Sequence, residues 1–382
     1  MKIAIIQPRV SYYLGGTEKV CLRYIQFLMK LNNKIVLYTT KPTKNYQYSI
    51  IYQKFKKQFS KNKNLKIVEF EIPTEREYIY EEYPGHNQNR WDSESILFNN
   101  FIFNYLNESN ADIVLTYYIV DSIFKPLFFP IVLYLGGFPR KEIKIYGAFL
   151  NFVDTVIYNS KNVENVWKKQ VAESSVSNEF VLAKAVDNFS IKNIKNPFER
   201  NDCFNFVFVG RLIERKGVQK IIKLLTKLKE ENLKIKLWVL GEGPEKEKLI
   251  RLSKEEGVFG QVNFVGFVEN VYDYYHFSDL VILPSLNGEG LMGTVAEAMI
   301  CGATVITSKG IGNEEIIENS KTGILIDPEN EKEFLYSILN LLKNEKKRKK
   351  IAKEAQIYAQ KNFSWEKVVN KMNGILKLSL KK

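Results

Sequence analysis

The amino-acid sequence predicts an α/β protein of two lobes, each built on a parallel β-sheet that is wrapped by helices. Short runs of β-branched and other apolar residues alternate with helical patterns along the chain, which is typical of strand–helix–strand units. These runs form two sets of about six. A chain of 382 residues is also too long for one compact core. We therefore expect two similar lobes rather than one large sheet.

The expected strands lie in both halves of the chain. In the first half they are Lys2–Gln7, Ile35–Thr40, Ile67–Ile72, Ile113–Tyr118, Ile131–Leu135 and Val156–Asn159. In the second half they are Phe206–Val209, Lys236–Leu240, Val262–Val265, Leu280–Leu283, Thr304–Thr307 and Ile324–Ile326. The polar stretch Lys192–Asp202 separates the two sets and contains Pro197, which is typical of a loop. We therefore assign residues 1–196 to an N-terminal lobe and residues 197–363 to a C-terminal lobe.

The composition excludes several kinds of site. The three cysteines lie far apart, so neither a disulfide framework nor a cysteine metal site is expected. The two histidines are too few for a histidine-rich metal cluster. The opening apolar run stops at Gln7-Pro8, and the longest apolar stretch, Leu127–Leu135, contains Pro130. Neither an export signal nor a membrane-spanning helix is therefore expected, and we predict a cytoplasmic protein.

The formal net charge of +13 suits a negatively charged partner: nucleic acid, anionic lipid or a phosphorylated small molecule. The basic segment Tyr46–Lys66 has the make-up of an amphipathic helix that would lie on an anionic membrane, at the inner membrane face. The alternative, which we favour, is a surface helix with its apolar face in the core.

The loop after the first strand carries Gly15-Gly16 and opens the helix expected over Lys19–Leu31. Two glycines let the backbone come close to a ligand, and the positive end of a helix favours an anion. The alternative is an ordinary tight turn in which Thr17 or Glu18 caps the helix.

A second candidate site follows the strand Phe206–Val209, where Gly210-Arg211 leads to Lys216-Gly217 at the start of another helix. Arg211 and Lys216 would place two cations beside the positive end of that helix. A diphosphate needs several hydrogen-bond donors and neutralising charge, so this pattern favours diphosphate binding. The alternative is a surface arginine and a surface lysine with no joint role.

A third candidate is the glycine-rich loop that follows the strand Leu280–Leu283, together with the helix expected from Thr294 to Cys301. Glu289 lies in the loop and Glu297 near the helix start. Carboxylates accept hydrogen bonds from the hydroxyl groups of a sugar, so this pair favours sugar binding.

Two alternatives apply to these carboxylates. The run Thr294-Val295-Ala296-Glu297 also fits a capping box, in which Glu297 would only bond the helix start. A pair of carboxylates is also used in glycoside hydrolysis, which spacing alone cannot show. The cations Arg211 and Lys216 favour a departing phosphate instead.

Taken jointly, these motifs resemble those of glycosyltransferase family 4, whose members are retaining, metal-independent enzymes with the GT-B fold. Each motif alone is weak, but they occur in the family's order over nearly the whole chain. They are Gly15-Gly16-Thr17-Glu18, Asn159-Ser160-Lys161, Gly210-Arg211, Lys216-Gly217, Gly241-Glu242-Gly243-Pro244, Val265-Gly266-Phe267-Val268, Glu289 to Glu297, Glu297-Ala298-Met299, Cys301-Gly302 and Thr322-Gly323-Ile324-Leu325.

The resemblance implies two Rossmann-like lobes that face each other across a cleft. It also implies that a C-terminal helix, within residues 364–382, returns to complete the N-terminal lobe. The N-terminal lobe would take the acceptor and the C-terminal lobe a nucleotide-diphosphate sugar of the UDP or GDP type. Neither a metal nor a cofactor is implied.

The resemblance also implies roles for individual residues. Arg211 and Lys216 would hold the donor diphosphate and stabilise it as it leaves, and Glu289 would position the transferred sugar. Glu297 would hold the ribose hydroxyls. The other residues that would contact the donor are Gly15, Gly16, Gly210, Gly266, Phe267, Val268, Leu291, Met292 and Gly293.

One stretch departs from the family pattern. Many members carry a histidine near the transferred sugar, in the loop after a strand of the N-terminal lobe. Here that stretch, Leu135–Arg140, has none. His86 is a candidate to compensate, although we favour a surface loop there. The missing histidine affects the expected identity of the donor sugar more than the expected type of reaction.

We therefore expect a retaining glycosyltransferase that moves a sugar from a nucleotide-diphosphate donor to a glycan, lipid-linked or other acceptor, in polysaccharide or glycoconjugate biosynthesis. An epimerase or a phosphorylase on the same fold is the enzymatic alternative. A basic nucleic-acid-binding protein is the non-enzymatic alternative, which lacks a recognition motif in this sequence.

Overall fold

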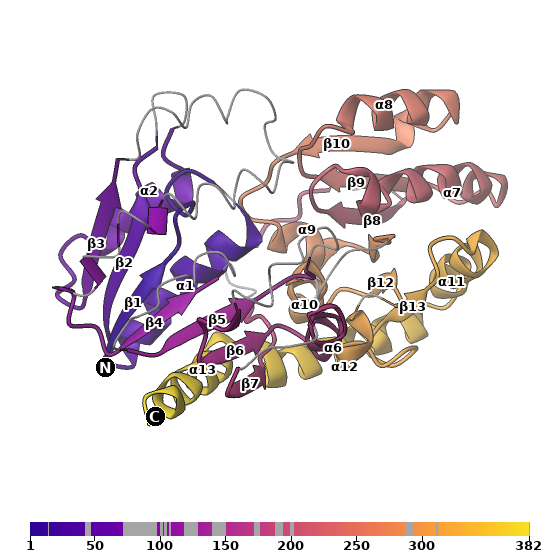
Figure 1. Ribbon diagram of the computed structural model, residues 1–382. Coiled ribbons are helices and arrows are strands. Elements are labelled where there is room, and N and C mark those ends of the chain that lie inside the picture. Colours follow the sequence, from indigo (N-terminus) through magenta and orange to yellow (C-terminus); the bar gives the residue numbers. More distant parts are fainter. Residues whose placement is uncertain are drawn as a thin grey trace. The chain divides into compact units, whose positions relative to one another are not determined.

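The computed structural model describes residues 1–13, 15–42, 47–71, 98–99, 102, 105–106, 108–117, 129–139, 150–171, 176–187, 194–198, 202–286, 293–310 and 312–381. The chain forms two compact units (Figure 1). The first comprises Met1–Lys184 and Glu366–Lys382, and the second comprises Ala185–Trp365. Within the described ranges, no helix has both the length and the apolar character needed to cross a bilayer.

The first unit is built on a parallel sheet in the order β3-β2-β1-β4-β5-β6-β7. Its strands are β1 (Lys2–Ile6), β2 (Lys34–Thr40), β3 (Leu65–Phe70), β4 (Ile113–Thr116), β5 (Ile131–Leu135), β6 (Thr155–Tyr158) and β7 (Asn178–Val181). The four strands β1, β4, β5 and β6 are almost wholly buried, as strands of a parallel sheet are when both faces are covered. The strand order reverses between β1 and β4, so ligands are expected at the carboxyl ends of these strands.

Four helices of the first unit are described. They are α1 (Gly16–Lys30), α2 (Ile50–Phe59), α6 (Lys161–Gln170) and α13 (Trp365–Ser379). The last of these comes from the far end of the chain. Asn33 Nδ2 donates to Asn373 Oδ1 over 3.0 Å, and the hydroxyls of Thr155 and Ser379 lie 2.8 Å apart. These contacts confirm the prediction that the C-terminal helix returns to the N-terminal lobe.

The basic segment expected over Tyr46–Lys66 contains α2. Ser49 caps this helix by accepting a hydrogen bond from the Tyr52 N–H over 3.2 Å, and Tyr52 and Phe55 are buried. The apolar face of α2 therefore packs into the unit, as a surface helix does. Contact of this segment with an anionic membrane stays a prediction.

The second unit is built on a parallel sheet in the order β10-β9-β8-β11-β12-β13. Its strands are β8 (Phe204–Val209), β9 (Ile235–Leu240), β10 (Val262–Gly266), β11 (Leu280–Leu283), β12 (Val305–Ser308) and β13 (Ile324–Ile326). Its α-helices are α7 (Val218–Glu230), α8 (Lys246–Glu255), α9 (Tyr272–Phe277), α10 (Gly293–Ile300), α11 (Glu331–Lys343) and α12 (Glu345–Phe363). Here the strand order reverses between β8 and β11. We call this reversal the switch point of the sheet, and ligands are expected at the carboxyl ends of the strands beside it.

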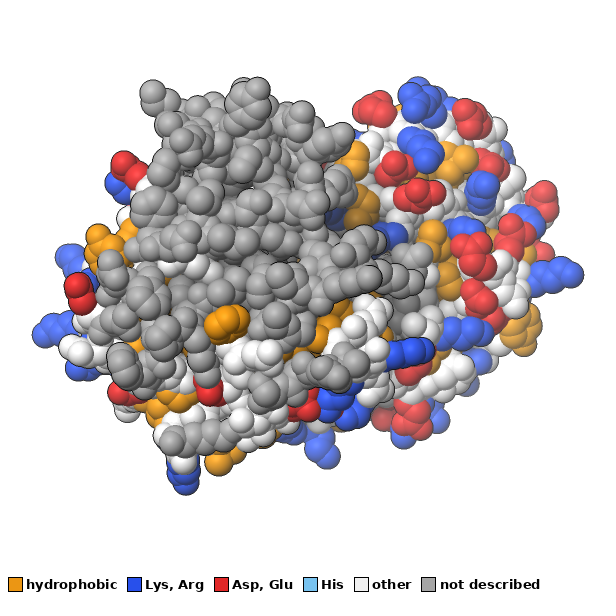
Figure 2. Space-filling model, viewed as in Figure 1, with side chains coloured by type: hydrophobic (Ala, Val, Ile, Leu, Met, Phe, Trp, Pro, Cys, Tyr) orange, Lys and Arg blue, Asp and Glu red, His pale blue; other side chains and the backbone are white. Residues whose placement is uncertain are grey.

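Charges of both signs are mixed on the surface of the second unit. Figure 2 shows acidic and basic side chains side by side over the region of α7 and α8. Ion pairs join Lys220 to Glu329 and Lys343 to Glu231. The positive charge on this face is therefore not gathered into the basic stripe that nucleic-acid binding requires.

Each expected strand is present, within a few residues of its expected ends, as far as the described residues extend. The sequence analysis did not predict strand β7. Its sequence, Asn-Glu-Phe-Val, has no apolar run, because at the edge of the sheet its side chains alternate between half-buried and exposed positions.

We predict that Leu376→Ala on α13 lowers the free energy of unfolding of the first unit by about 2–5 kcal/mol, because Leu376 is fully buried and its loss leaves a cavity. Equilibrium urea unfolding of the full chain measures the effect. Leu378→Ala is the matched control: it lies on the same helix but is 53% exposed, so a change within about 0.5 kcal/mol is expected. Equal effects of the two substitutions would contradict the packing of α13.

Candidate functional site

Backbone hydrogen bonds join the loops at the carboxyl ends of four strands in the second unit. Leu212, after β8, donates to the Glu242 carbonyl over 2.9 Å, which ties this loop to the one after β9. Gly241 donates to the Gly266 carbonyl at the end of β10 over 2.8 Å. Leu286, after β11, donates to the Arg215 carbonyl over 2.7 Å. The loops that carry the predicted site therefore form one connected structure at the switch point.

Two glycines allow these loops to pack closely. Gly217 has φ 75°, and a Cβ there would overlap the Pro284 carbonyl oxygen. Gly241 has φ 144°, and its Cβ would overlap the Gly210 carbonyl oxygen. Both positions require a backbone that residues with side chains rarely adopt, and both place one loop directly against another. This explains the glycines of the Lys216-Gly217 and Gly241-Glu242-Gly243-Pro244 motifs.

The structure brings Arg211 and Lys216 together. Arg211 follows β8 directly, and Lys216 ends a 3₁₀ turn, Glu214–Lys216, which leads through Gly217 into α7. A Cβ on Gly210 would lie 4.0 Å from Lys216 Cδ, so the lysine stem passes beside the residue that precedes Arg211. Both side chains are half-buried. Both cationic residues therefore belong to the loop that follows β8, and their joint contact with a diphosphate stays a prediction.

Arg215 adds a third cation that the sequence analysis missed. Burial lowers the pKa of Arg215, and the Arg211 guanidinium lowers it further. The two guanidinium groups are thus close enough to repel each other. The only sequence signal for Arg215 was that it stands next to Lys216, before Gly217. In an irregular loop, this position does not predict the direction of the Arg215 side chain.

Glu297 lies on α10, the helix that follows β11 in the chain and begins at Gly293. The helix bounds place Thr294 one residue after the helix start, so the capping-box alternative for Glu297 stays open. Glu297 is half-buried. Burial raises the pKa of Tyr275 well above its usual value, and the neighbouring Glu297 carboxylate raises it further. Glu297 therefore faces a buried tyrosine hydroxyl.

Other predicted donor contacts lie at the same edge or outside the described residues. Gly266 has φ 85° at the end of β10, with Phe267 exposed and Val268 half-buried after it. Three predicted residues lie outside the described residues: Glu289, Leu291 and Met292. Their roles stay predictions.

In the first unit, Gly15 and Gly16 lie at the start of α1, near the switch point of that sheet. Gly15 precedes the helix with extended backbone, and the Glu18 carboxylate lies against it. This arrangement agrees with the alternative in which an acid occupies the helix start. A cation is also near, since a Cβ on Gly16 would lie 3.6 Å from Lys184 Nζ.

The loop that lacks a histidine is held by side chains of the same unit. Asn159 Nδ2 donates to the Gly136 carbonyl over 2.9 Å, and Trp167 Nε1 donates to the Gly137 carbonyl over 2.8 Å. Ser160 caps α6 by accepting from the Val163 N–H over 3.1 Å. The Asn159-Ser160-Lys161 motif therefore has a structural role here. His86 lies outside the described residues.

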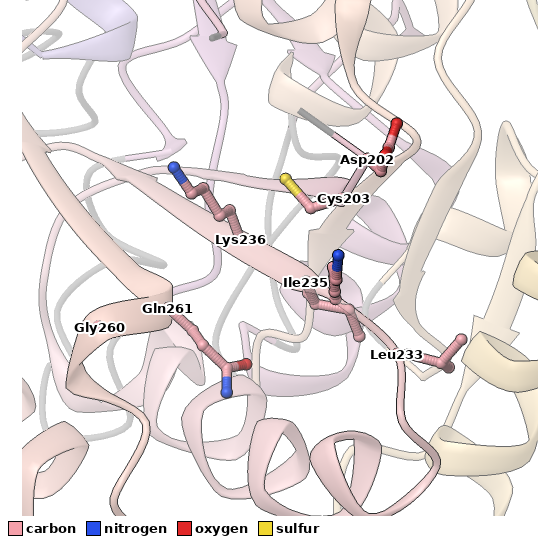
Figure 3. Close-up of a pocket in the computed structure, with 8 residues that line it drawn as sticks. Asp202, Cys203, Leu233, Ile235, Lys236, Gly260 and Gln261 are labelled. Carbon is pink, nitrogen blue, oxygen red and sulfur yellow. The ribbon is translucent and has the colours of Figure 1, made fainter. Parts of the chain in front are cut away.

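A cavity of about 570 Å³ lies elsewhere in the second unit, at the amino ends of β8, β9 and β10 (Figure 3). Its lining includes Cys203, Lys234 and Lys236. Burial raises the pKa of Cys203, so its thiol stays protonated and is a poor nucleophile at neutral pH. The cavity is at the edge of the sheet opposite to the switch point, where ligands of such sheets bind.

Known proteins resemble this chain in sequence over part of its length. Residues 190–358 match the family Glycosyl transferases group 1. This matched segment, which we call the group 1 domain below, is similar to that family. An uncharacterized glycosyltransferase of Methanocaldococcus jannaschii is 32% identical over 190 residues, which are 48% of this chain and 47% of that protein. The chain spans about half the length of the curated relatives it matches.

Solved structures match the chain over nearly its full length. Sucrose-phosphate synthase from Thermosynechococcus elongatus has a TM-score of 0.80 at 16% identity, covering 99% of this chain and 98% of its own. HepE of Anabaena in complex with UDP-glucose has a TM-score of 0.77 at 18% identity, covering 99% and 100%. At these identities the likeness establishes the fold, which is GT-B, as the sequence predicts.

We predict that Gly241→Ala destabilises the group 1 domain by more than about 3 kcal/mol, because it adds backbone strain and overlaps the Gly210 carbonyl. Gly257→Ala is the control: Gly257 has φ 66° but open space at its Cβ, so strain alone should cost about 1–2 kcal/mol. Urea unfolding of both variants measures the difference. Equal losses would show that contact between the loops after β8 and β9 does not matter.

Proposed function

We propose that this chain transfers a sugar from a nucleotide-diphosphate sugar to a glycan, lipid-linked or other acceptor, with retention of configuration and without a metal ion. The observation that carries the proposal is the group of cations Arg211, Arg215 and Lys216 at the switch point of the group 1 domain. A diphosphate is the part of the donor that needs such charge. HepE, the structural neighbour described above, binds UDP-glucose, which supports a uridine diphosphate sugar as the first donor to test.

The proposed reaction breaks the bond between the anomeric carbon and the diphosphate oxygen. The acceptor hydroxyl oxygen bonds to that carbon on the same face, and its proton passes to the departing diphosphate. Negative charge on the leaving oxygen therefore grows in the transition state. Arg211 and Lys216 stabilise this charge, so they should act on turnover as well as on binding.

Two acidic side chains complete the proposed site. Glu297 accepts hydrogen bonds from the two ribose hydroxyls, which a carboxylate with two oxygens matches. Glu289 positions the transferred sugar, as the resemblance to family 4 implies. Because the cations neutralise the leaving group, the proposal assigns no step to a metal.

The proposal is tested first by ligand binding and then by turnover. We expect a UDP, GDP or ADP sugar at 100 times its dissociation constant to stabilise the full chain by about 2.7 kcal/mol in a thermal-shift measurement. With the donor that binds, Arg211→Ala and Lys216→Ala should each reduce release of the nucleoside diphosphate by more than about tenfold, because each loses charge stabilisation in the transition state.

Lys223→Ala is the matched control, since Lys223 is an exposed cation on α7. Its turnover should equal that of the wild type. Wild-type turnover in the Arg211 and Lys216 variants would refute their assignment. A changed sugar without release of nucleoside diphosphate would indicate an epimerase instead.

We further predict that Arg215→Met reduces the stabilisation by nucleoside diphosphate. The substitution keeps an apolar stem but removes a half-buried charge beside Arg211, so the ligand meets less positive charge. Thermal shifts with UDP at low ionic strength measure the effect, because salt screens it.

Lys223→Met provides the comparison, because it removes a charge from an exposed position of the same domain. It should leave the ligand-induced shift unchanged. A shift for Arg215→Met as large as that of the wild type would show that Arg215 does not contribute to the anion site.

A further inference from the structure

The face of α10 that carries Glu297 is packed against α9. Cys301 N donates to the Glu297 carbonyl over 3.3 Å, so these residues are one helical turn apart and share a face. His276 Nδ1 on α9 lies 3.1 Å from the Cys301 carbonyl oxygen, which fixes α9 against this face. The two helices are in direct contact. Helix α9 therefore packs against the part of α10 that carries Glu297 and Cys301.

Tyr275 is the α9 side chain beside Glu297. It is fully buried, and its hydroxyl makes no hydrogen bond of normal geometry among the described residues, although a weaker hydrogen-bonding interaction with the Glu297 carboxylate contributes to its raised pKa. The Glu297 carboxylate is nevertheless close enough to raise the pKa of Tyr275, after the larger effect of burial. A buried hydroxyl without a partner costs about 1–3 kcal/mol, so this position needs an explanation.

Packing alone does not supply that explanation. Phenylalanine would fill the same space without burying a hydroxyl, and it would avoid the cost of desolvation. Because burial raises the pKa of Tyr275 above its usual value, the hydroxyl is a hydrogen-bond donor at neutral pH. The acceptor that it faces is the side chain that the proposed function assigns to the ribose.

We propose that Tyr275 is a positioning residue for Glu297: its hydroxyl donates to one carboxylate oxygen when a nucleoside diphosphate is bound, and the other oxygen accepts from the ribose hydroxyls. This inference rests on the proposed function. A hydrogen bond to a charged acceptor shortens and strengthens as the carboxylate settles into one rotamer. The carboxylate is then oriented before it meets the sugar, which lowers the entropy lost on binding.

The inference is tested with Tyr275→Phe, which keeps the ring and removes only the hydroxyl oxygen. Calorimetric titration with UDP, GDP and ADP first identifies the nucleotide that binds. We expect Tyr275→Phe to weaken binding of that nucleotide about tenfold, as the loss of a hydrogen bond to a charged group does. Its 2′,3′-dideoxy analogue, which offers no ribose hydroxyl donors, should bind both proteins within about twofold of each other.

A double-mutant cycle separates positioning from general structure. In a Glu297→Ala background, Tyr275→Phe should cause no further loss, because the residue acts only through Glu297. Tyr274→Phe is the matched control: it removes a hydroxyl from the neighbouring tyrosine, whose ring packs on Phe198 and Trp238, and should leave binding unchanged.

Three results would overturn the inference. Unchanged nucleotide affinity in Tyr275→Phe would show that the Tyr275 hydroxyl does not contribute to nucleotide binding. An equal loss for the nucleotide and its dideoxy analogue, or an additive loss with Glu297→Ala, would make the role structural. If the wild type bound none of the three nucleotides, the proposed function would fail and the inference with it, a result distinct from the other two.

Discussion

Close backbone packing against two glycines holds the candidate site of the group 1 domain together. Gly217 lies against the Pro284 carbonyl and Gly241 against the Gly210 carbonyl, so the loops after β8, β9 and β11 leave no room for a side chain between them. Arg211 and Lys216 lie on the segments that this packing fixes. Cations on fixed backbone need little reorganisation when charge develops on a leaving group, which is the basis of electrostatic catalysis. The site therefore depends on residues that have no side chains.

The fold was predictable because a parallel sheet leaves a strong pattern in the sequence. Strands buried on both faces read as short apolar runs, and β11, Leu-Val-Ile-Leu, is an example. Strand β7 lies at the edge, where partial exposure permits Asn178 and Glu179, and its pattern is lost. The helix expected from Thr294 to Cys301 is present as α10, Gly293–Ile300, within one residue of its expected ends.

The site was predictable only where its residues belong to a motif. Arg211, Lys216 and Glu297 stand next to glycines or at a helix start, and the structure places all three in the group 1 domain near the switch point. Arg215 and Tyr275 carry no such mark. Arg215 reaches Arg211 because a 3₁₀ turn brings the chain back, and Tyr275 reaches Glu297 because two helices pack side by side. The first contact depends on an irregular local turn and the second on tertiary packing, and a single sequence reveals neither.

Two costs in the free domain point to one kind of ligand. Burial and the neighbouring Arg211 guanidinium lower the pKa of Arg215, an unfavourable effect on its charged form that an anion beside these groups would offset. The Tyr275 hydroxyl is buried beside Glu297 without a good hydrogen bond, a cost that falls when the carboxylate is drawn into a fixed position. A phosphate relieves only the first cost, and a free sugar relieves only the second. A nucleoside diphosphate carries both an anionic group and a pair of adjacent hydroxyls, so it is the simplest ligand that relieves both.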